Sequence, residues 1–376
     1  MTANNLLYCA TDKEIYDVLM SAKQKISVPV LQELAKDRGI FYSHKESRET
    51  LVHCLSLLTH DYNDLHVILE QREHVGRTEK TTSITLNTEL TIDEIKEVAK
   101  EYIADSPADE KAVSHQKGTD QYVVNVQYSE VDYSKTRLVQ RTPKEAGIEF
   151  HVEKDKTIIR IPSNAKAKEI VENLRARLGE KKKIDIPVAL IELTEFTSAA
   201  ERTRFFTLLI SSLEEFKLDN VTSVKVEPIK QEIVDDLDIE DDQNEEEAKQ
   251  DALALIRNVA LKGETLLASE EYQSLQKKGF FITSIIWRSK QSSMPFPIVE
   301  FEATFDEPAV GKGFKYSVRG ALNFSDGEYT KTLRPIEQEI KQKLIALIEK
   351  TAINAIAQIR SEAAQEITAG APAHGG

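Results

Sequence analysis

Residues 299–305 read Val-Glu-Phe-Glu-Ala-Thr-Phe, and this alternation of apolar and polar side chains decides the fold class of the chain. A strand with this pattern turns its apolar residues toward a core and its polar residues toward water. Sheets with one solvated face are typically antiparallel, so the pattern predicts an antiparallel sheet. Apolar stretches at 280–287 and 314–324 are the neighbouring strands that such a sheet needs.

A long amphipathic helix is predicted after these strands, beginning at Arg334-Pro335 and ending near Ile359. Its apolar residues recur at helical spacing, so it is expected to pack on the sheet. A helix of this length also suits a protein partner or a second copy of the chain. With a further helix at 248–261, these elements predict a C-terminal α+β domain over 248–362. The tail, 363–376, is expected to be disordered.

The middle of the chain repeats the order of strands followed by a long helix, which is compatible with a diverged internal duplication. No residue-level repeat supports that interpretation. Period-2 alternation on both sides of a short polar turn predicts a hairpin, and the whole region, 83–230, is predicted to be an α+β middle domain. The expected elements are strands at 122–128, 148–152, 159–161 and 187–193, a turn at 153–156, a loop at 105–120, and helices at 164–178 and 198–213.

Residues 1–73 are predicted to form a small helical domain. Thr11 and Glu14 have the spacing of a capping box, in which both side chains satisfy backbone donors at a helix start. A linker is expected at 74–82 and an acidic linker at 231–247. The sequence therefore predicts an α+β multi-domain chain: a small helical domain, then two mixed α/β regions whose antiparallel sheets are packed by helices.

The charge of the chain is unevenly distributed. It contains 49 Lys+Arg and 63 Asp+Glu, for a net charge of −14, and ten of the acids lie in 231–247. The overall charge is therefore a poor argument against nucleic-acid binding. Two cysteines, Cys9 and Cys54, are too few for a disulfide framework and suit a reducing cytosol. No secretory leader or membrane-spanning stretch is evident, so a cytoplasmic protein without membrane contact is expected.

Residues 28–58 combine two short predicted helices with an extended link. The first helix ends in the pattern Leu-x-x-Leu-Ala-Lys-x-x-Gly-Ile, and a leucine follows twelve residues after the glycine. The segment resembles the helix-extended-helix modules, which include the SAP domain and the N-terminal subdomain of the transcription terminator Rho. It departs from SAP in its longer link and in having His44 where glycine is usual. The matching positions are Leu31, Leu34, Ala35, Lys36, Gly39, Ile40, Tyr42, Ser43 and Leu51.

The resemblance implies nucleic-acid binding, with the link and the second helix near the phosphates. The alternative is a helical protein-interaction domain, because residues 11–58 hold seven basic and seven acidic side chains. A second group of cations along the helix at 164–178 offers another phosphate contact, or simply a solvated helix end. The candidate nucleic-acid-binding residues are Lys36, Arg38, His44, Lys45 and Arg48, with Lys166, Lys168, Arg175, Arg177, Lys181, Lys182 and Lys183 in the second group.

No catalytic residue is predicted, because the motifs for phosphate loops, dinucleotide binding, nucleophile elbows, zinc proteases and kinases are missing. Five histidines precede residue 75, but the cysteine pair that completes a zinc site is missing, so no metal or cofactor is expected. Carboxylates at Glu149 and at 153–155 leave a divergent metal-dependent nuclease as an alternative. The sequence argues against catalysis more than for it.

Three functional hypotheses follow. The first is a non-catalytic nucleic-acid-binding protein, with DNA as the first candidate and RNA left open. General architecture also suggests an accessory subunit of a bacterial system that acts on DNA, such as phage defence. The second is an assembly or scaffold subunit that binds proteins and no nucleic acid. The third is the divergent nuclease.

Overall fold

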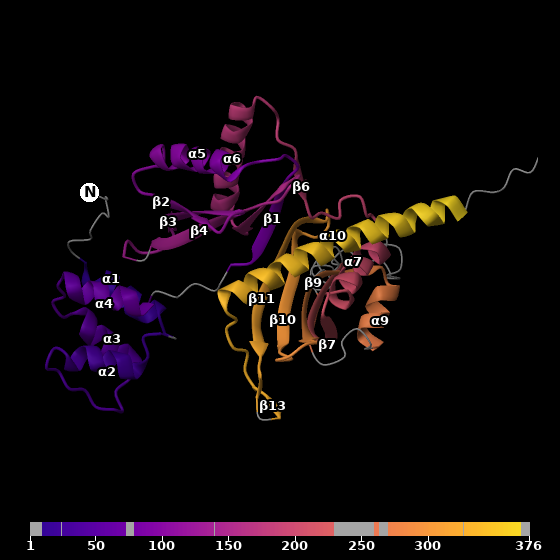
Figure 1. The fold of residues 1–376 in the computed structure, drawn as a ribbon. Coiled ribbons are helices and arrows are strands. Elements are labelled where there is room, and N and C mark those ends of the chain that lie inside the picture. Colours follow the sequence, from indigo (N-terminus) through magenta and orange to yellow (C-terminus); the bar gives the residue numbers. More distant parts are fainter. Residues whose placement is uncertain are drawn as a thin grey trace, which may run out of the picture. The chain divides into compact units, whose positions relative to one another are not determined.

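A computed structural model describes residues 10–23, 25–72, 79–138, 140–228, 259–262, 270–325 and 327–369 of the chain. The chain divides into two compact units (Figure 1). The first unit comprises Met1–Glu79, Thr88–Thr157 and Asn164–Ile186, and the second comprises Lys80–Asn87, Ile158–Ser163 and Pro187–Gly376.

Four helices at the start of the first unit form a small bundle. The predicted capping box is confirmed, because the Thr11 hydroxyl accepts a hydrogen bond from the Glu14 amide while the Glu14 carboxylate accepts from the Thr11 amide. Leu19, Leu31 and Leu51 are among the completely buried residues of the bundle core. The helices are α1 (Asp12–Ser21), α2 (Val28–Lys36), α3 (Arg48–Ser56) and α4 (Tyr62–Arg72).

The remainder of the first unit is a three-stranded antiparallel sheet with two helices. Helix α5 contacts β2 and β3, and α6 contacts β4. The loop after β3 reaches the helical bundle, where Leu138 is buried in the core and Arg137 forms an ion pair with Glu14 at 2.9 Å. The elements are α5 (Ile92–Ala104), β2 (Lys111–Lys117), β3 (Gln121–Val131), β4 (Arg141–Val152) and α6 (Ala165–Lys182), with strand order β2-β3-β4.

The second unit is built on one larger sheet with the strand order β5-β1-β11-β10-β9-β7-β8, and β6 also pairs with β1. Strands β7, β9, β10 and β11 are antiparallel neighbours. Their bounds, with those of the other elements, are β1 (Thr81–Leu86), β5 (Thr157–Pro162), β6 (Val188–Leu190), α7 (Ala199–Ser211), β7 (Phe216–Pro228), β8 (Val259–Lys262), α9 (Glu270–Lys277), β9 (Phe280–Gln291), β10 (Ile298–Glu307), β11 (Lys312–Leu322), β12 (Phe324–Ser325), β13 (Glu328–Tyr329) and α10 (Gln338–Ala369).

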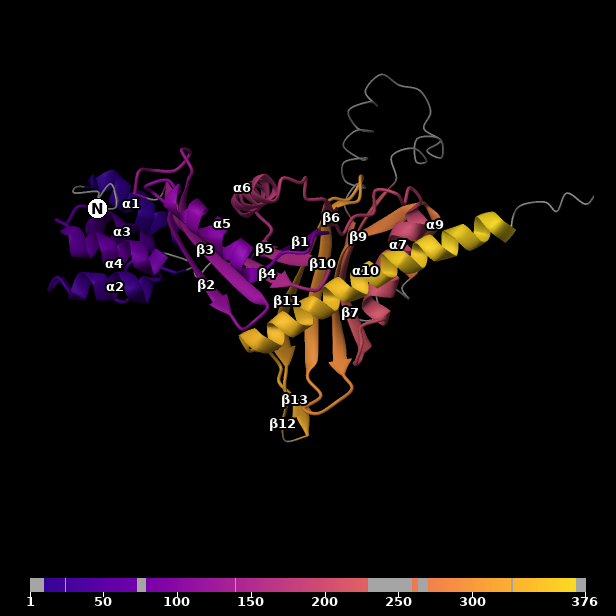
Figure 2. The same cartoon turned by 45° about the horizontal axis from the view of Figure 1, so that its top comes forward.

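The core of the second unit lies between this sheet and its helices. Trp287, Phe301 and Tyr316 are completely buried, and they come from β9, β10 and β11 at mutually paired or adjacent positions. Helices α7 and α10 pack on this face, and both views show α10 crossing the strands (Figures 1 and 2). The alternation at 299–305 is confirmed as the cause, because Val299, Phe301, Ala303 and Phe305 all belong to the core.

A buried ion pair ties β5 to the long helix within this core. The Arg160 guanidinium donates to both carboxylate oxygens of Glu349 at 2.8–3.0 Å, and the Tyr316 hydroxyl donates to the same carboxylate. Burial, followed by the Glu349 charge, raises the pKa of Tyr316 well above its ordinary value. Because each buried polar group has a partner, the cluster fixes the helix against the sheet without leaving an unpaired charge.

The α+β fold class is confirmed, whereas the structure divides the chain along other boundaries than 83–230 and 248–362. Helix α7 and strand β7 precede residue 230, yet their apolar residues lie in one core with β9, β10 and β11. Strand β1 pairs with β11, more than 200 residues later. Sequence patterning shows which residues are apolar but not which distant strand they will pair with.

Several elements differ from their predicted form. Residues 111–117, predicted as part of a loop, form β2, since β3 offers them a complete antiparallel edge. Residues 259–262 form β8 where a helix was expected, and 248–258 lie outside the described residues. Helix α10 extends to Ala369, seven residues into the predicted tail. The acidic linker, 231–247, and most of the first linker, 74–78, also lie outside the described residues. None of the described helices is long and apolar enough to cross a bilayer.

Candidate nucleic-acid interface

The segment that resembles a helix-extended-helix module folds as two short helices joined by an extended link. Gly39 ends α2 with a positive φ of 71°, a conformation that glycine adopts without strain. The chain then runs back along α2, because the Gln32 side-chain amide donates to the Ser43 carbonyl at 3.2 Å. Ser47 caps the start of α3 by accepting from the Thr50 amide at 3.1 Å.

Three of the five candidate residues in this module lie on its surface. Lys36, His44 and Lys45 are exposed, and their side chains form no ion pair with any residue in the described part of the chain. Lys36 is one helical turn beyond Gln32, so it lies on the side of α2 along which the link runs. Phe41 is in the same link and is 79% exposed. We call Lys36, Phe41, His44 and Lys45 the link surface.

The other two candidates in the module hold the bundle together. Arg48 is only 9% exposed, and its guanidinium donates to the Leu19 carbonyl at 2.6 Å and to the Ile26 carbonyl. The prediction that Arg48 contacts a phosphate is therefore wrong, because its guanidinium is buried and donates to backbone carbonyls of the bundle. The cause is tertiary, because α3 carries Arg48 to the Leu19 carbonyl in the last turn of α1 and to the Ile26 carbonyl after it, contacts with no local sequence signal.

Arg38 is paired with an acid from another helix. Its guanidinium lies 2.7 Å from the Asp64 carboxylate. Burial alone raises the pKa of Asp64, but the hydrogen bonds from Arg38 and from the Asp61 amide outweigh it and hold that pKa below its ordinary value. The side chain is 18% exposed, so Arg38 offers little free charge to a polyanion.

The second group of predicted cations, along α6, is largely neutralised. Lys166 pairs with Glu110 at 2.6 Å, and Lys182 pairs with Glu94 at 2.7 Å. Burial lowers the pKa of Lys166, but its contacts with Glu110 and Glu169 raise it overall. The remaining pairs are Arg175 with Glu172 and Asp185, Arg177 with Asp105, and Lys181 with Glu97 and Glu101.

Two members of the α6 group differ from the rest. Lys168 is exposed, and within the described chain its side chain has no acid partner. Lys183 is exposed as well and ends the helix in a left-handed conformation, with a φ of 54°. Four of the other cations pair with acids of α5 or of the loop after it, which are distant in the sequence, whereas Arg175 pairs with Glu172 of α6 and with Asp185. The structure thus favours the solvated, acid-paired interpretation of this cluster.

The histidines and carboxylates considered for metal chemistry are dispersed. His60 contacts the Leu55 carbonyl at 2.7 Å, and Glu149 contacts His151 at 3.6 Å. Glu153 pairs with Lys156 across the turn between β4 and β5. Within the described residues, no group of three His, Cys, Asp or Glu side chains is arranged to hold a metal ion.

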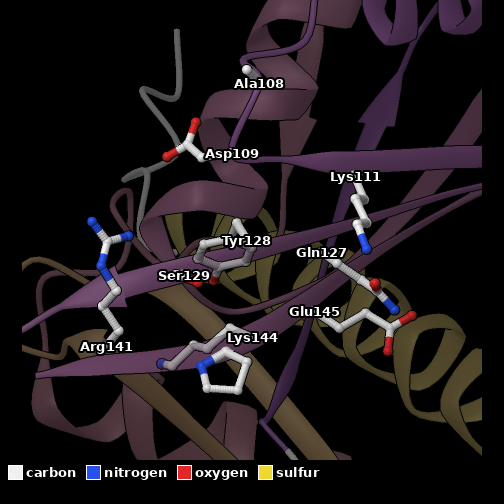
Figure 3. Close-up of a pocket in the computed structure, with 10 residues that line it drawn as sticks. Ala108, Asp109, Lys111, Gln127, Tyr128, Ser129, Arg141, Lys144 and Glu145 are labelled. Carbon is white, nitrogen blue, oxygen red and sulfur yellow. The ribbon is translucent and has the colours of Figure 1, made fainter. Parts of the chain in front are cut away.

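A surface hollow of about 470 Å³ lies on the small sheet of the first unit (Figure 3). Lys111, Gln127 and Glu145 line it from directly paired positions of β2, β3 and β4. Figure 3 shows Lys111 and Arg141 at opposite sides of the hollow. Its charged lining comprises the basic Lys111, Arg141 and Lys144 and the acidic Asp109 and Glu145, so charge alone does not define a ligand for it.

The sequence-based search missed Phe41 as a candidate, although the residue sits in the quoted link. An aromatic residue between Gly39 and the basic pair His44-Lys45 was the available signal. No protein-family model matches this chain, and no curated protein is significantly similar to it in sequence.

Proposed function

We propose that the chain is a non-catalytic nucleic-acid-binding protein and that the link surface is a contact site for unpaired nucleotides. The observation that carries the proposal is the exposed Phe41 ring beside cations that have no acid partner among the described residues. Proteins that bind single strands combine aromatic side chains, on which bases stack, with Lys or Arg that follow the phosphates. The link surface offers both.

Each residue of the link surface has a defined task in this proposal. Phe41 stacks on a base, an interaction worth about 1–3 kcal/mol in single-strand binding proteins. Lys36 and Lys45 contact phosphates on either side of that base. His44 adds a hydrogen-bond donor. Arg48 and Arg38 have no direct contact and serve to hold α2 and α3 in place.

The scaffold hypothesis receives less support from the same geometry. The long C-terminal helix was its main candidate, but Leu344, Ile348, Ile356 and Ile359 are buried within the chain's own core. Ile340 and Ile353 are exposed singly, at 48% and 44%. Isolated exposed apolar residues are normal on protein surfaces and do not define a docking face.

The test is a fluorescence-anisotropy titration of the whole chain with labelled single-stranded DNA, single-stranded RNA and duplex DNA at two salt concentrations. Phe41→Ala is expected to weaken single-strand binding by about 1–3 kcal/mol without changing the salt dependence. Lys45→Glu is expected to weaken binding and to reduce the salt slope by about 0.7 or more.

Lys168→Glu is the matched control, because Lys168 is an exposed lysine without an acid partner among the described residues, but it lies on α6. It makes the same change in net charge as Lys45→Glu. Equal losses in both variants would mean that only the overall charge matters, and no binding by the wild-type chain to any of the three probes would refute the proposal.

A further inference from the structure

The sheet of the second unit has a second face, opposite to the one that packs on α7 and α10. On β10, Glu300, Glu302 and Thr304 alternate with the core residues and therefore belong to this opposite face. The register extends the face to the neighbouring strands, where Arg288 of β9 pairs with Glu300 and Lys217 of β7 pairs with Lys290. We call this opposite side of β7, β9, β10 and β11, together with Lys80 just before β1, the polar face.

The polar face is cationic in a chain whose net charge is −14. By register and alternation it carries seven basic and four acidic side chains, a surplus of three positive charges. Asp219 lies at a bulge of β7, and counting it still leaves the cations in excess. The basic residues are Lys80, Lys217, Lys225, Arg288, Lys290, Lys315 and Arg319, and the acids are Glu227, Glu300, Glu302 and Asp306.

Glu300 and Glu302, at the centre of the polar face, form ion pairs with several of its cations. Glu300, only 5% exposed, accepts from Arg288 at 2.9 Å and lies 3.1 Å from the guanidinium of Arg319. Glu302 lies 2.6 Å from the ammonium of Lys80. A guanidinium has five N–H donors, so an arginine held by one carboxylate keeps others for a second anion. The glutamates thereby position the cations without consuming their full hydrogen-bonding capacity.

Lys217 and Lys290 are the members without an acid partner among the described residues. They occupy directly opposed positions on β7 and β9, and both are exposed. Like charges at opposed positions of a sheet repel and destabilise it. The ring of Tyr329 lies 5.4 Å from the Lys290 ammonium, which offsets part of this repulsion. An anion bound between Lys217 and Lys290 would neutralise the remaining repulsion.

The spread of the cations fits a double helix better than a single strand. Lys225, Ser284, Thr304 and Lys315 form one row of paired residues, with lysines at its two ends and two buried hydroxyl residues between them. Lys315 also forms an ion pair with Asp306, whereas no ion pair joins Lys225 to an acid among the described residues. Three strand spacings separate the ends, about 14 Å. The major groove of a DNA duplex, about 12 Å wide, separates its two rows of phosphates by a similar distance.

We propose that the polar face binds the phosphate backbone of duplex DNA. The proposal extends the proposed nucleic-acid binding to a second surface with a different preference, and it does not require the link surface. The contacts are to phosphates, so binding is expected to be independent of base sequence and to weaken steeply with salt.

The main test is the double charge reversal Lys217→Glu/Lys290→Glu in the whole chain. At 0.1 M salt, its affinity for a 30-base-pair DNA duplex is expected to fall at least tenfold. The slope of log affinity against log salt is expected to become shallower by about 1.8, the loss of two phosphate contacts. Single-strand binding through the link surface is expected to be unchanged.

The control is Lys13→Glu/Lys343→Glu, two exposed lysines on α1 and α10 with the same change in net charge and without an acid partner in the described chain. This control is expected to keep duplex affinity within about twofold. Circular dichroism and thermal melting of both doubles show that each is folded. If the two doubles lose duplex affinity equally, the polar face is not the site and the proposal is overturned.

A second variant predicts the opposite effect. Glu302→Gln removes an acid that contacts Lys80 and Arg319, so it is expected to raise duplex affinity about threefold and to steepen the salt slope. Unchanged or weaker duplex binding by a folded Glu302→Gln protein contradicts the proposal.

Binding of anionic vesicles in place of duplex DNA, lost in the Lys217→Glu/Lys290→Glu variant, assigns the face to a membrane surface and overturns the proposal. The single-strand and duplex measurements also distinguish the link surface from the polar face. Loss of single-strand binding in Phe41→Ala with intact duplex binding bears on the link surface alone. Loss of duplex binding in the polar-face double bears on the polar face alone.

Discussion

The link surface and the α6 group were both predicted as phosphate contacts, yet their basic side chains have different surroundings in the structure. On α6 most of the basic side chains meet an acid, such as Glu94, Glu101 or Glu110, from another element. On the link surface, Lys36, His44 and Lys45 have no acid partner among the described residues. A basic residue in such a cluster therefore keeps its charge available to a polyanion only to the extent that no acidic side chain pairs with it. That condition is tertiary.

The largest expected effect separates structural from surface cations. Arg48→Met leaves the carbonyls of Leu19 and Ile26 without their donor in a buried place. It is expected to destabilise the helical bundle by about 2–3 kcal/mol, the cost of losing charged hydrogen bonds to buried groups. Hydrogen exchange of the α1 and α3 amides in the whole chain measures this opening.

Lys45→Met is the control for that comparison, because Lys45 is exposed and its side chain has no acid partner in the described residues. It is expected to change exchange protection by less than about 0.5 kcal/mol. If Arg48→Met shows normal exchange protection and weaker nucleic-acid binding, Arg48 contacts the nucleic acid and its structural role is wrong.

An intermediate effect is expected on α6. Lys166→Met leaves the Glu110 carboxylate, only 10% exposed, without its 2.6 Å partner. The variant is expected to lose about 1–2 kcal/mol of stability, less than a completely buried pair because both groups keep some solvent contact. Urea unfolding followed by intrinsic fluorescence measures the change, with Lys168→Met as the control. A fall in nucleic-acid affinity with unchanged stability would contradict the paired role of Lys166.

The smallest effect concerns pH. Hydrogen bonds from Arg137, stronger than the opposing effect of burial, hold the pKa of Glu14 below its ordinary value. A carboxyl with a lowered folded-state pKa binds its proton more readily in the unfolded chain. The pair therefore stabilises the bundle above about pH 4.5, and this contribution is lost as the pH falls through the folded-state pKa.

Arg137→Gln is expected to remove less than about 1 kcal/mol at pH 7 and nothing at pH 2, because the pair is partly exposed. Thermal melting of the wild-type chain and the variant across that pH range measures the difference. A difference in melting temperature between the wild-type chain and Arg137→Gln that grows toward low pH would contradict the direction of this pKa shift.

Local features of the chain were predictable where short-range physics dominates. The capping box at Thr11 forms as expected, and helices α5 and α7 begin with the same motif at Thr91 and Ser198, because a side chain three residues away is within reach. The alternation at 299–305 also fixed which side chains enter the core. Failures occurred where the partner is distant. Residues 111–117 became a strand only because β3 lies beside them, and Arg48 became buried only because α1 ends there.

The candidate sites follow the same division. Sequence reasoning located the link and its cations, but it could not exclude Arg38, whose partner Asp64 is 26 residues away. It did not find the polar face either, because Lys217 and Lys290 are 73 residues apart and meet only through the register of β7 and β9. A charge repeated along one helix is visible in the sequence. A charge shared between strands is visible only once they pair.

The sequence by itself determined the fold class, the helix starts and the inward-facing residues of the strands, because propensity, capping and hydrophobic period act within a few residues. Only the tertiary structure decided how the chain divides into units, which cations keep their charge free and which face of the sheet gathers them. Strand pairing and ion pairing join residues that are distant along the chain, and their energies depend on burial and register that no local pattern specifies.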